Sequence, residues 1–233
     1  GVSWKAPSAV AAGTASFNTR IGGQLRYETP VWNGFSAGYS YRPDPNVSTT
    51  QNQSLSAMGA KWTDGTYYAA VGREIHNDYH AFGGTVAATG ANIRTASTRS
   101  KDTATRLSFG YTKGALQLAG DVSSLLYSEA ATVGKFERYT TTAWQVSADY
   151  AINANWNVAA NYASGAAGSC TIMGSAACTT EGLGGNLLSL GGKYNFDKNI
   201  SAYGIYGSNK NNSGANFGSP RSEEHTSELQ SHL

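Results

Sequence analysis

The feature that most constrains this chain of 233 residues is a strict alternation of apolar with polar or small residues. In the segment 105–112, for example, Leu107, Phe109 and Tyr111 alternate with Ser108 and Gly110. A period of two places successive side chains on opposite faces of a β-strand. Similar segments occupy residues 20–28, 35–41, 54–63, 67–74, 116–122, 144–150, 156–162, 188–194 and 200–208. The pattern therefore predicts an all-β protein of about ten antiparallel strands, many with the roughly 9–11 residues that a tilted membrane strand requires.

The predicted connections alternate between short and long. Short turns are expected at residues 30–34, 63–65, 113–114, 152–155 and 196–199. Long polar loops are expected at 42–53, 75–102, 128–140 and 165–184. This regular segregation is typical of a transmembrane up-and-down β-barrel, in which one rim carries turns and the other carries loops.

Composition excludes several classes of protein. Charged residues make up only 14% of the chain and the formal net charge is +2, which argues against a nucleic-acid-binding protein. No apolar stretch approaches the 18 residues of a membrane-spanning helix. A soluble β-barrel or sandwich would also alternate, but a small filled core could not bury the row of ionisable groups on the polar face.

The apolar face carries large aromatic residues at the ends of its segments, as an aromatic girdle at a membrane interface would. The candidate girdle residues are Tyr27, Trp32, Tyr41, Trp62, Tyr111, Trp144, Tyr150, Trp156, Tyr162 and Tyr194. The polar face supplies the candidate lining of a water-filled lumen. Its members are Arg20, Gln24, Arg26, Glu28, Lys61, Arg106, Asp121, Asp149 and Lys193. A basic excess on such a wall would favour anions, although charges that pair with one another would leave no net selectivity.

Residues 20–43, which read RIGGQLRYETPVWNGFSAGYSYRP, resemble the central signature of the Gram-negative trimeric porins, especially the β-proteobacterial type. The hairpin segments 147–163 and 189–207 are similar to repeated units of that family. The resemblance implies a sixteen-stranded parent barrel in the bacterial outer membrane. It implies a homotrimer that passes small hydrophilic solutes and ions without enzymatic chemistry or a cofactor. It also places Arg20 and Arg26 on the basic wall opposite the constriction loop.

Measured against that family, the sequence matches only about ten of the sixteen strands. We therefore expect residues 1–16 to be a remnant of the constriction-loop region, 17–208 to be barrel strands and 209–220 to be an extracellular loop. Residues 221–233 resemble a translated sequencing adapter and are expected to be a non-native tail. Ten strands leave two unpaired edges, so the expected form is an open, curved sheet. A non-conducting structural or adhesive barrel is the alternative function.

The remaining chemistry-bearing residues are few. Cys170 and Cys178 lie in a loop rich in Gly, Ser and Ala that contains no His, which favours a disulfide over a metal site. His76 and His80 have the spacing of a helical zinc motif, but the Glu of that motif is replaced by Asn77. Both histidines fall in a predicted loop, so we expect solvated surface residues. Neither a catalytic residue nor a metal ligand is predicted.

Overall fold

The computed structural model describes Phe17 and Val133 together with residues 22–43, 52–78, 99–130, 135–174 and 178–213. The regular secondary structure of these residues consists of strands, in agreement with the alternation. The strands are β1 (Leu25–Glu28), β2 (Phe35–Arg42), β3 (Ser54–Thr63), β4 (Tyr67–Asn77), β5 (Lys101–Lys113), β6 (Leu116–Ser128), β7 (Phe136–Ala151), β8 (Trp156–Gly165), β9 (Ser169–Ile172), β10 (Gly185–Asn195) and β11 (Ser201–Asn211). Among the described residues we find no helix whose length and hydropathy would let it span a bilayer.

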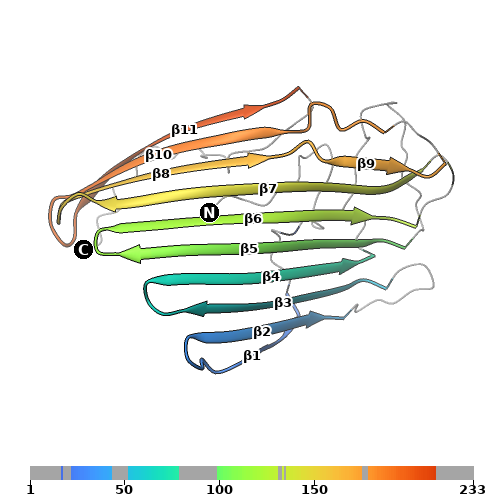
Figure 1. The fold of residues 1–233 in the computed structure, drawn as a ribbon, viewed down its shortest axis with the longest axis horizontal. Helices are drawn as coiled ribbons and strands as arrows, with labels where there is room; N and C mark the ends of the chain where they lie inside the picture. Colours follow the sequence, from blue (N-terminus) through green and yellow to red (C-terminus); the bar gives the residue numbers. More distant parts are fainter. Residues whose placement is uncertain are drawn as a thin grey trace.

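The strands form one antiparallel sheet in which neighbours along the chain are neighbours in space. The order runs from β1 through β8 to β10 and β11, and β9 pairs with β7 beyond the end of β8. Figure 1 shows β1 at one edge and β11 at the other, and no register joins these two strands. The predicted open β-sheet is therefore confirmed, with eleven strands in place of about ten.

All five short turns lie at one end of the sheet, on the left of Figure 1. Three of them begin with an Asp or Asn whose Oδ1 accepts two backbone N–H groups. Asp64 accepts from the nitrogens of Thr66 and Tyr67, at 2.8 and 2.7 Å. Asn153 and Asp197 accept in the same way from the residues two and three positions later, at 2.7–2.9 Å. A side-chain acceptor of this kind mimics a backbone turn, which explains why these sequences reverse the chain.

The connections at the opposite end, here called the loop end, are shorter than the sequence suggested. The loop predicted at 128–140 is shorter than expected, because β6 ends at Ser128, β7 begins at Phe136, and their ladder continues to the pair Ser128 and Arg138. Cross-strand bonding extends β7 to 16 residues, beyond the length of a typical strand. The loop predicted at 165–184 contains β9. The two ends of the loop predicted at 75–102 belong to β4 and β5.

Of the described residues 22–28 in the segment predicted at 20–28, only those of β1 form a strand. Gly23 has a φ of +73°, which interrupts an extended strand before Gln24. Arg20, the first of the proposed lining residues, lies outside the described residues. The same holds for His80, for all of 1–16 and 221–233, and for all but the first five residues of 209–220.

Candidate functional site

The strand register divides the side chains into two faces, because residues opposite one another in a ladder point to the same side. One row pairs Ser36 with Lys61, Lys61 with Ala70 and Ala70 with Ser108, and it continues to Asp121 and Gln145. We call this side the polar face. Every described lining candidate within a strand lies on it: Arg26, Glu28, Lys61, Arg106, Asp121, Asp149 and Lys193.

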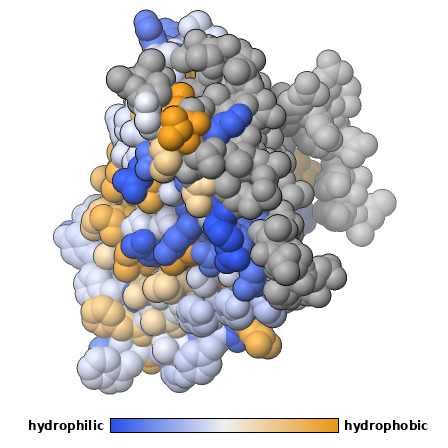
Figure 2. Space-filling model, turned by 90° about the vertical axis from the view of Figure 1, so that its right-hand side faces the viewer, coloured by the Kyte–Doolittle hydropathy of each residue, from blue (hydrophilic) through white to orange (hydrophobic). Residues whose placement is uncertain are grey.

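Over the polar face lies a hollow of about 1060 Å³ that extends from β4 to β11. Ser108, Gln145, Ser147, Asn161 and Ser189 line it beside the charged residues Arg106, Asp121 and Asp149. In Figure 2, which looks onto the loop end, strongly hydrophilic residues gather in the middle of the view next to a band of hydrophobic ones. Small and polar side chains thus leave open space along this wall.

Most of the charges on the polar face are compensated locally. A guanidinium nitrogen of Arg106 donates to Asp121 at 2.7 Å, and Gln145 donates to the same carboxylate oxygen. The Asp121 side chain is only 6% exposed, so its charge acts mainly on Arg106. Arg26 forms an ion pair with Glu28. These two pairs contribute little to the net field of the wall.

Lys61 and Lys193 differ from the two paired arginines. Both are exposed, and neither has an ion-pair partner among the described residues. Lys61 lies between Ser36 and Ala70 in its row, whereas Lys193 lies between Asn157 and Tyr203. Asp149 lies on the same face two strands away from Lys193 and accepts a hydrogen bond from Asn157 at 2.6 Å. The uncompensated positive charge of the described wall therefore comes from lysine.

A buried ionisable group at the loop end escaped the sequence analysis. His76 is fully buried in β4, so the expectation of a solvated loop residue is wrong. Its Nε2 lies 2.5 Å from Oε1 of Glu74, and the Phe17 ring packs on it at 4.6 Å between centroids. Asp102 occupies the facing position on β5 and is also buried. The sequence does place His76 and Glu74 on the same face of the strand, because they are two residues apart. The burial of His76, however, depends on its contact with Phe17, which is far away in the sequence.

Asp78 terminates β4 as a buried acceptor. Its carboxylate accepts the backbone N–H groups of Asn52 and Ser100, at 2.9 and 3.0 Å, and lies 3.0 Å from Nε of Arg99. These bonds join three chain segments at the loop end. No group of three or more His, Cys, Asp or Glu residues that could hold a metal occurs in the described part of the chain.

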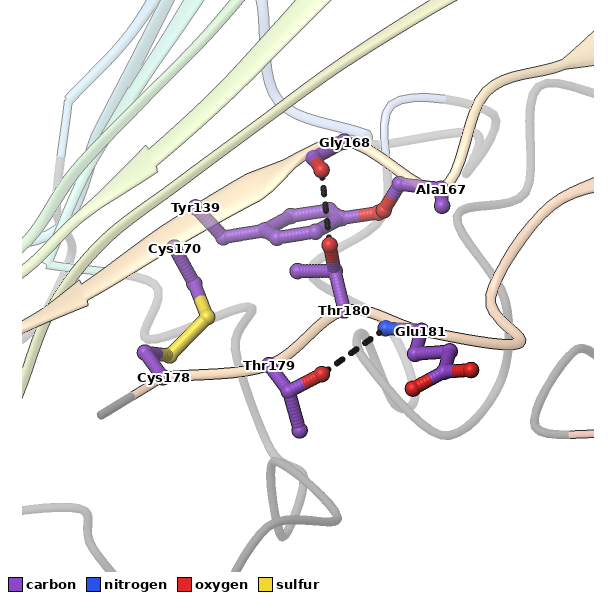
Figure 3. Close-up of a disulfide and its surroundings, with 8 residues drawn as sticks. All are labelled: Tyr139, Ala167, Gly168, Cys170, Cys178, Thr179, Thr180 and Glu181. Atoms are coloured by element: carbon purple, nitrogen blue, oxygen red, sulfur yellow. Dashed lines mark hydrogen bonds between the residues drawn. A yellow bond between two sulfur atoms is a disulfide. The ribbon is translucent and has the colours of Figure 1, made fainter.

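The two cysteines form a disulfide at the loop end, beside an apolar cluster on the polar face. Cys170 in β9 is bonded to Cys178, and it faces Tyr139 of β7 across the ladder (Figure 3). The Tyr139 hydroxyl donates to the carbonyl of Ala167 at 2.9 Å, and Thr180 donates to the carbonyl of Gly168 at 2.7 Å. The cluster comprises Leu125, Tyr127, Tyr139, Ile172 and Leu183. The chain after Cys178 is thus held against the strands rather than free.

The opposite side, here called the outer face, is apolar and exposed. Aromatic pairs lie on it near the short turns, including Trp156 with Tyr194 at 4.9 Å and Tyr67 with Tyr111 at 5.4 Å between ring centroids. Seven of the ten girdle candidates lie at this end: Tyr27, Trp32, Trp62, Tyr111, Tyr150, Trp156 and Tyr194. The other three do not lie near short turns. Trp144 and Tyr162 pack together in mid-sheet at 5.5 Å, and Tyr41 lies at the loop end of β2.

A polar, hollowed face opposite an exposed apolar face is the arrangement of a membrane channel wall. The family model of the Gram-negative porins matches residues 2–214 of the chain. The chain belongs to the Gram-negative porins. This assignment confirms the resemblance seen in residues 20–43 and places the protein in the bacterial outer membrane.

The solved structures include a similar porin, the anion-selective porin from Comamonas acidovorans. The two share 17% sequence identity with a TM-score of 0.64. The match covers 90% of this chain and 54% of that porin, so the present chain spans about half of its relative's length. None of the curated protein sequences matches the chain. At this identity the structural likeness concerns the fold alone, and the family assignment rests on the family model.

Proposed function

We propose that this porin forms a passive, water-filled channel for small hydrophilic solutes and ions, with a mild preference for anions. The polar face would be the channel wall, and the outer face would contact lipid. Transport would depend on sieving by width and on the electrostatic field of the wall, with no bond made or broken. The observation that carries the proposal is the set of charged and polar side chains on one face of the sheet, which line a hollow that spans β4 to β11.

The sign of the preference follows from which charges are compensated. Arg26 and Arg106 have carboxylate partners, whereas Lys61 and Lys193 have none among the described residues. A low-dielectric wall strengthens the field of such charges in the water beside it. The two lysines, rather than the arginines emphasised by the sequence, therefore support anion preference. The structural neighbour is also described as anion-selective.

The test is a measurement of reversal potential across planar bilayers containing the intact porin, with unequal KCl on the two sides. Replacing both lysines (Lys61→Glu and Lys193→Glu) should shift permeability toward K⁺. The shift should grow as salt falls from 0.1 M to 0.01 M, because the screening length rises from about 10 Å to about 30 Å. Lys198→Glu is the matched control, since Lys198 lies in the exposed turn between β10 and β11.

Two outcomes would contradict the proposal. An unchanged reversal potential in the double variant would show that the lysines do not set selectivity. Absence of conductance in the wild-type protein would favour the alternative, a structural or adhesive barrel that does not conduct. The family resemblance further supports a homotrimer, which should conduct in groups of three equal steps and migrate as a trimer in unheated gels.

A further inference from the structure

A small cavity lies on the polar face toward the loop end, next to the large hollow described above. Its volume is about 240 Å³, below the range of about 300–1,000 Å³ that is typical of sites for drug-sized ligands. Its floor consists of small residues on four neighbouring strands: Ala57 on β3, Gly72 on β4, Ala104 on β5 and Ser123 on β6. The recess is therefore suited to one small organic solute.

Two accessible groups of opposite charge border this cavity, Glu74 of β4 and Arg106 of β5. Arg106 faces Gly72 across the ladder, and Glu74 lies two residues further along β4. Diagonal neighbours of this kind are about 7–8 Å apart at the base of their side chains. The Glu74 side chain is 28% exposed and the Arg106 side chain 40% exposed. A solute in the cavity can therefore reach both.

A different partner holds each of the two charged groups in place. Oε1 of Glu74 lies 2.5 Å from Nε2 of His76, whose side chain is fully buried. A guanidinium nitrogen of Arg106 donates to Asp121 at 2.7 Å. A carboxylate offers about four acceptor positions and a guanidinium five N–H donors, so one partner does not exhaust either group. The cavity is thus bordered by an acid and a base that are already oriented, which lowers the cost of binding.

The side of the cavity nearest the loop end is apolar. Phe17 lines it, and the Phe17 ring lies 4.6 Å from that of His76 and 5.8 Å from that of Tyr127, between centroids. His76 and Tyr127 are one row nearer the loop end than Glu74 and Leu125. Leu125 also lines the cavity and belongs to the apolar cluster. Hydrocarbon and opposite charges are therefore presented together.

We infer that this cavity binds a small zwitterion, namely an α-amino acid with an apolar side chain. The ammonium group of the solute donates to Glu74, its carboxylate accepts from Arg106, and its hydrocarbon part contacts Phe17 and Leu125. A simple anion would meet the like charge of Glu74, and a simple cation would meet that of Arg106. The inference deepens the proposed function and rests on it, because the polar face must be open to water, but the binding can be measured without conduction.

The test is saturation-transfer NMR of the intact porin in detergent micelles with three probes that share a branched carbon skeleton. L-Leucine carries both charges, isocaproate lacks the ammonium group, and isoamylamine lacks the carboxylate. Loss of a hydrogen bond to a charged group weakens binding about tenfold or more. We therefore expect the wild-type porin to bind L-leucine roughly tenfold more tightly than either of the other probes.

Variants of the cavity assign the effect to its side chains. Glu74→Gln keeps the shape of the side chain and removes the charge, so L-leucine should bind about tenfold more weakly. Isocaproate should bind this variant at least as tightly as the wild type, because a repulsion is lost. Phe17→Ala should weaken all three probes to a similar extent. Glu181→Gln is the matched control, since Glu181 is exposed beyond the disulfide and does not line the cavity.

Three results would overturn the inference. They are no saturable binding of L-leucine to the wild type, binding of both truncated probes as tight as that of L-leucine, and equal affinity of wild type and Glu74→Gln for L-leucine. If Glu74→Gln fails to fold, the three probes on the wild type still decide. A porin that conducts but does not bind L-leucine contradicts this inference alone, whereas one that binds L-leucine but does not conduct contradicts the channel proposal alone.

Discussion

The single residues that reverse the chain act through their side-chain acceptors. Asp64, Asn153 and Asp197 begin three of the short turns with the same two hydrogen bonds. At Asp64 the donors also affect ionisation: the N–H groups of Tyr67 and Thr66 hold the pKa of its carboxyl below the usual value. The charged form is thus favoured in the folded turn.

This pKa shift predicts a pH dependence of stability. Because the folded pKa of Asp64 is lowered, its contribution is fully present above the unfolded pKa of about 3.9 and is lost as pH falls through the folded pKa. Asp64→Asn should therefore destabilise the porin near neutral pH, and its difference from wild type should shrink below about pH 4. The measurement is the urea midpoint of unfolding from lipid vesicles at several pH values.

Asn153 provides the control for that experiment, because it makes the same bonds without a charge. Asn153→Ala should cost about 1 kcal/mol at every pH tested, as the loss of two neutral turn bonds does. If the difference between Asp64→Asn and wild type stayed constant down to pH 2, the carboxylate would not be the source of the effect.

Among the elements, the junction of β8 and β9 determines the form of the loop end. Gly168 has a φ of +77°, and a Cβ at this position would lie 2.3 Å from the carbonyl oxygen of Thr140. Only glycine allows the chain to leave β8 and resume pairing with β7 as β9. The disulfide then joins Cys170 to Cys178, eight positions later in the sequence. The backbone conformation of Gly168 and the disulfide together hold this connection over the apolar cluster.

Removal of the disulfide should loosen this element without unfolding the sheet. For the paired variant Cys170→Ser and Cys178→Ser, loop-closure entropy predicts a loss of about 2–3 kcal/mol, confined to the connection between β8 and β10. Limited proteolysis of intact cells or proteoliposomes should then cleave near residues 171–184, whereas the wild type should resist. Uniform protection in both proteins would indicate that Thr180, Tyr139 and the cluster suffice.

At the scale of the whole molecule, the described sheet has two edges that no strand covers. β1 and β11 each pair on one side only. β11 also presents apolar side chains to the polar side, where Tyr203 and Ile205 are 76% and 74% exposed. Unpaired backbone groups are costly in hydrocarbon, so a membrane form requires further pairing partners for both edges.

A polypeptide restricted to residues 22–213 should therefore fail to insert as a stable monomer. We expect it to aggregate or to pair edge to edge when diluted from urea into lipid vesicles, with no heat-modifiable band on gels. The intact porin, refolded in parallel, should show such a band. A monomeric, protease-resistant form of the short polypeptide would mean that β1 and β11 can close on each other.

Alternation alone revealed the strand class, the two faces and the short turns, because a period of two and the turn acceptors are local properties. The signature in residues 20–43 led to the correct family. Sequence reasoning failed at the loop end, where His76 is buried by contact with Phe17 and where the β6–β7 ladder continues to the pair Ser128 and Arg138. It also could not show that Arg106 is neutralised by Asp121, since that pair depends on the register between β5 and β6.

The order of residues was thus enough to separate a polar from an apolar face along most strands, since a strand turns each successive residue to the other side. Tyr203 and Ile205 of β11 are exceptions, because they lie on the polar face. The tertiary structure decided which charged side chains on a face form ion pairs with one another and which do not. Cross-strand neighbours determine the surroundings of the cations on both faces. These cations are Lys61 and Lys193 on the polar face and Arg73, Lys101 and Arg138 on the outer face. Those neighbours are set by hydrogen-bonded register between segments, which no single segment encodes.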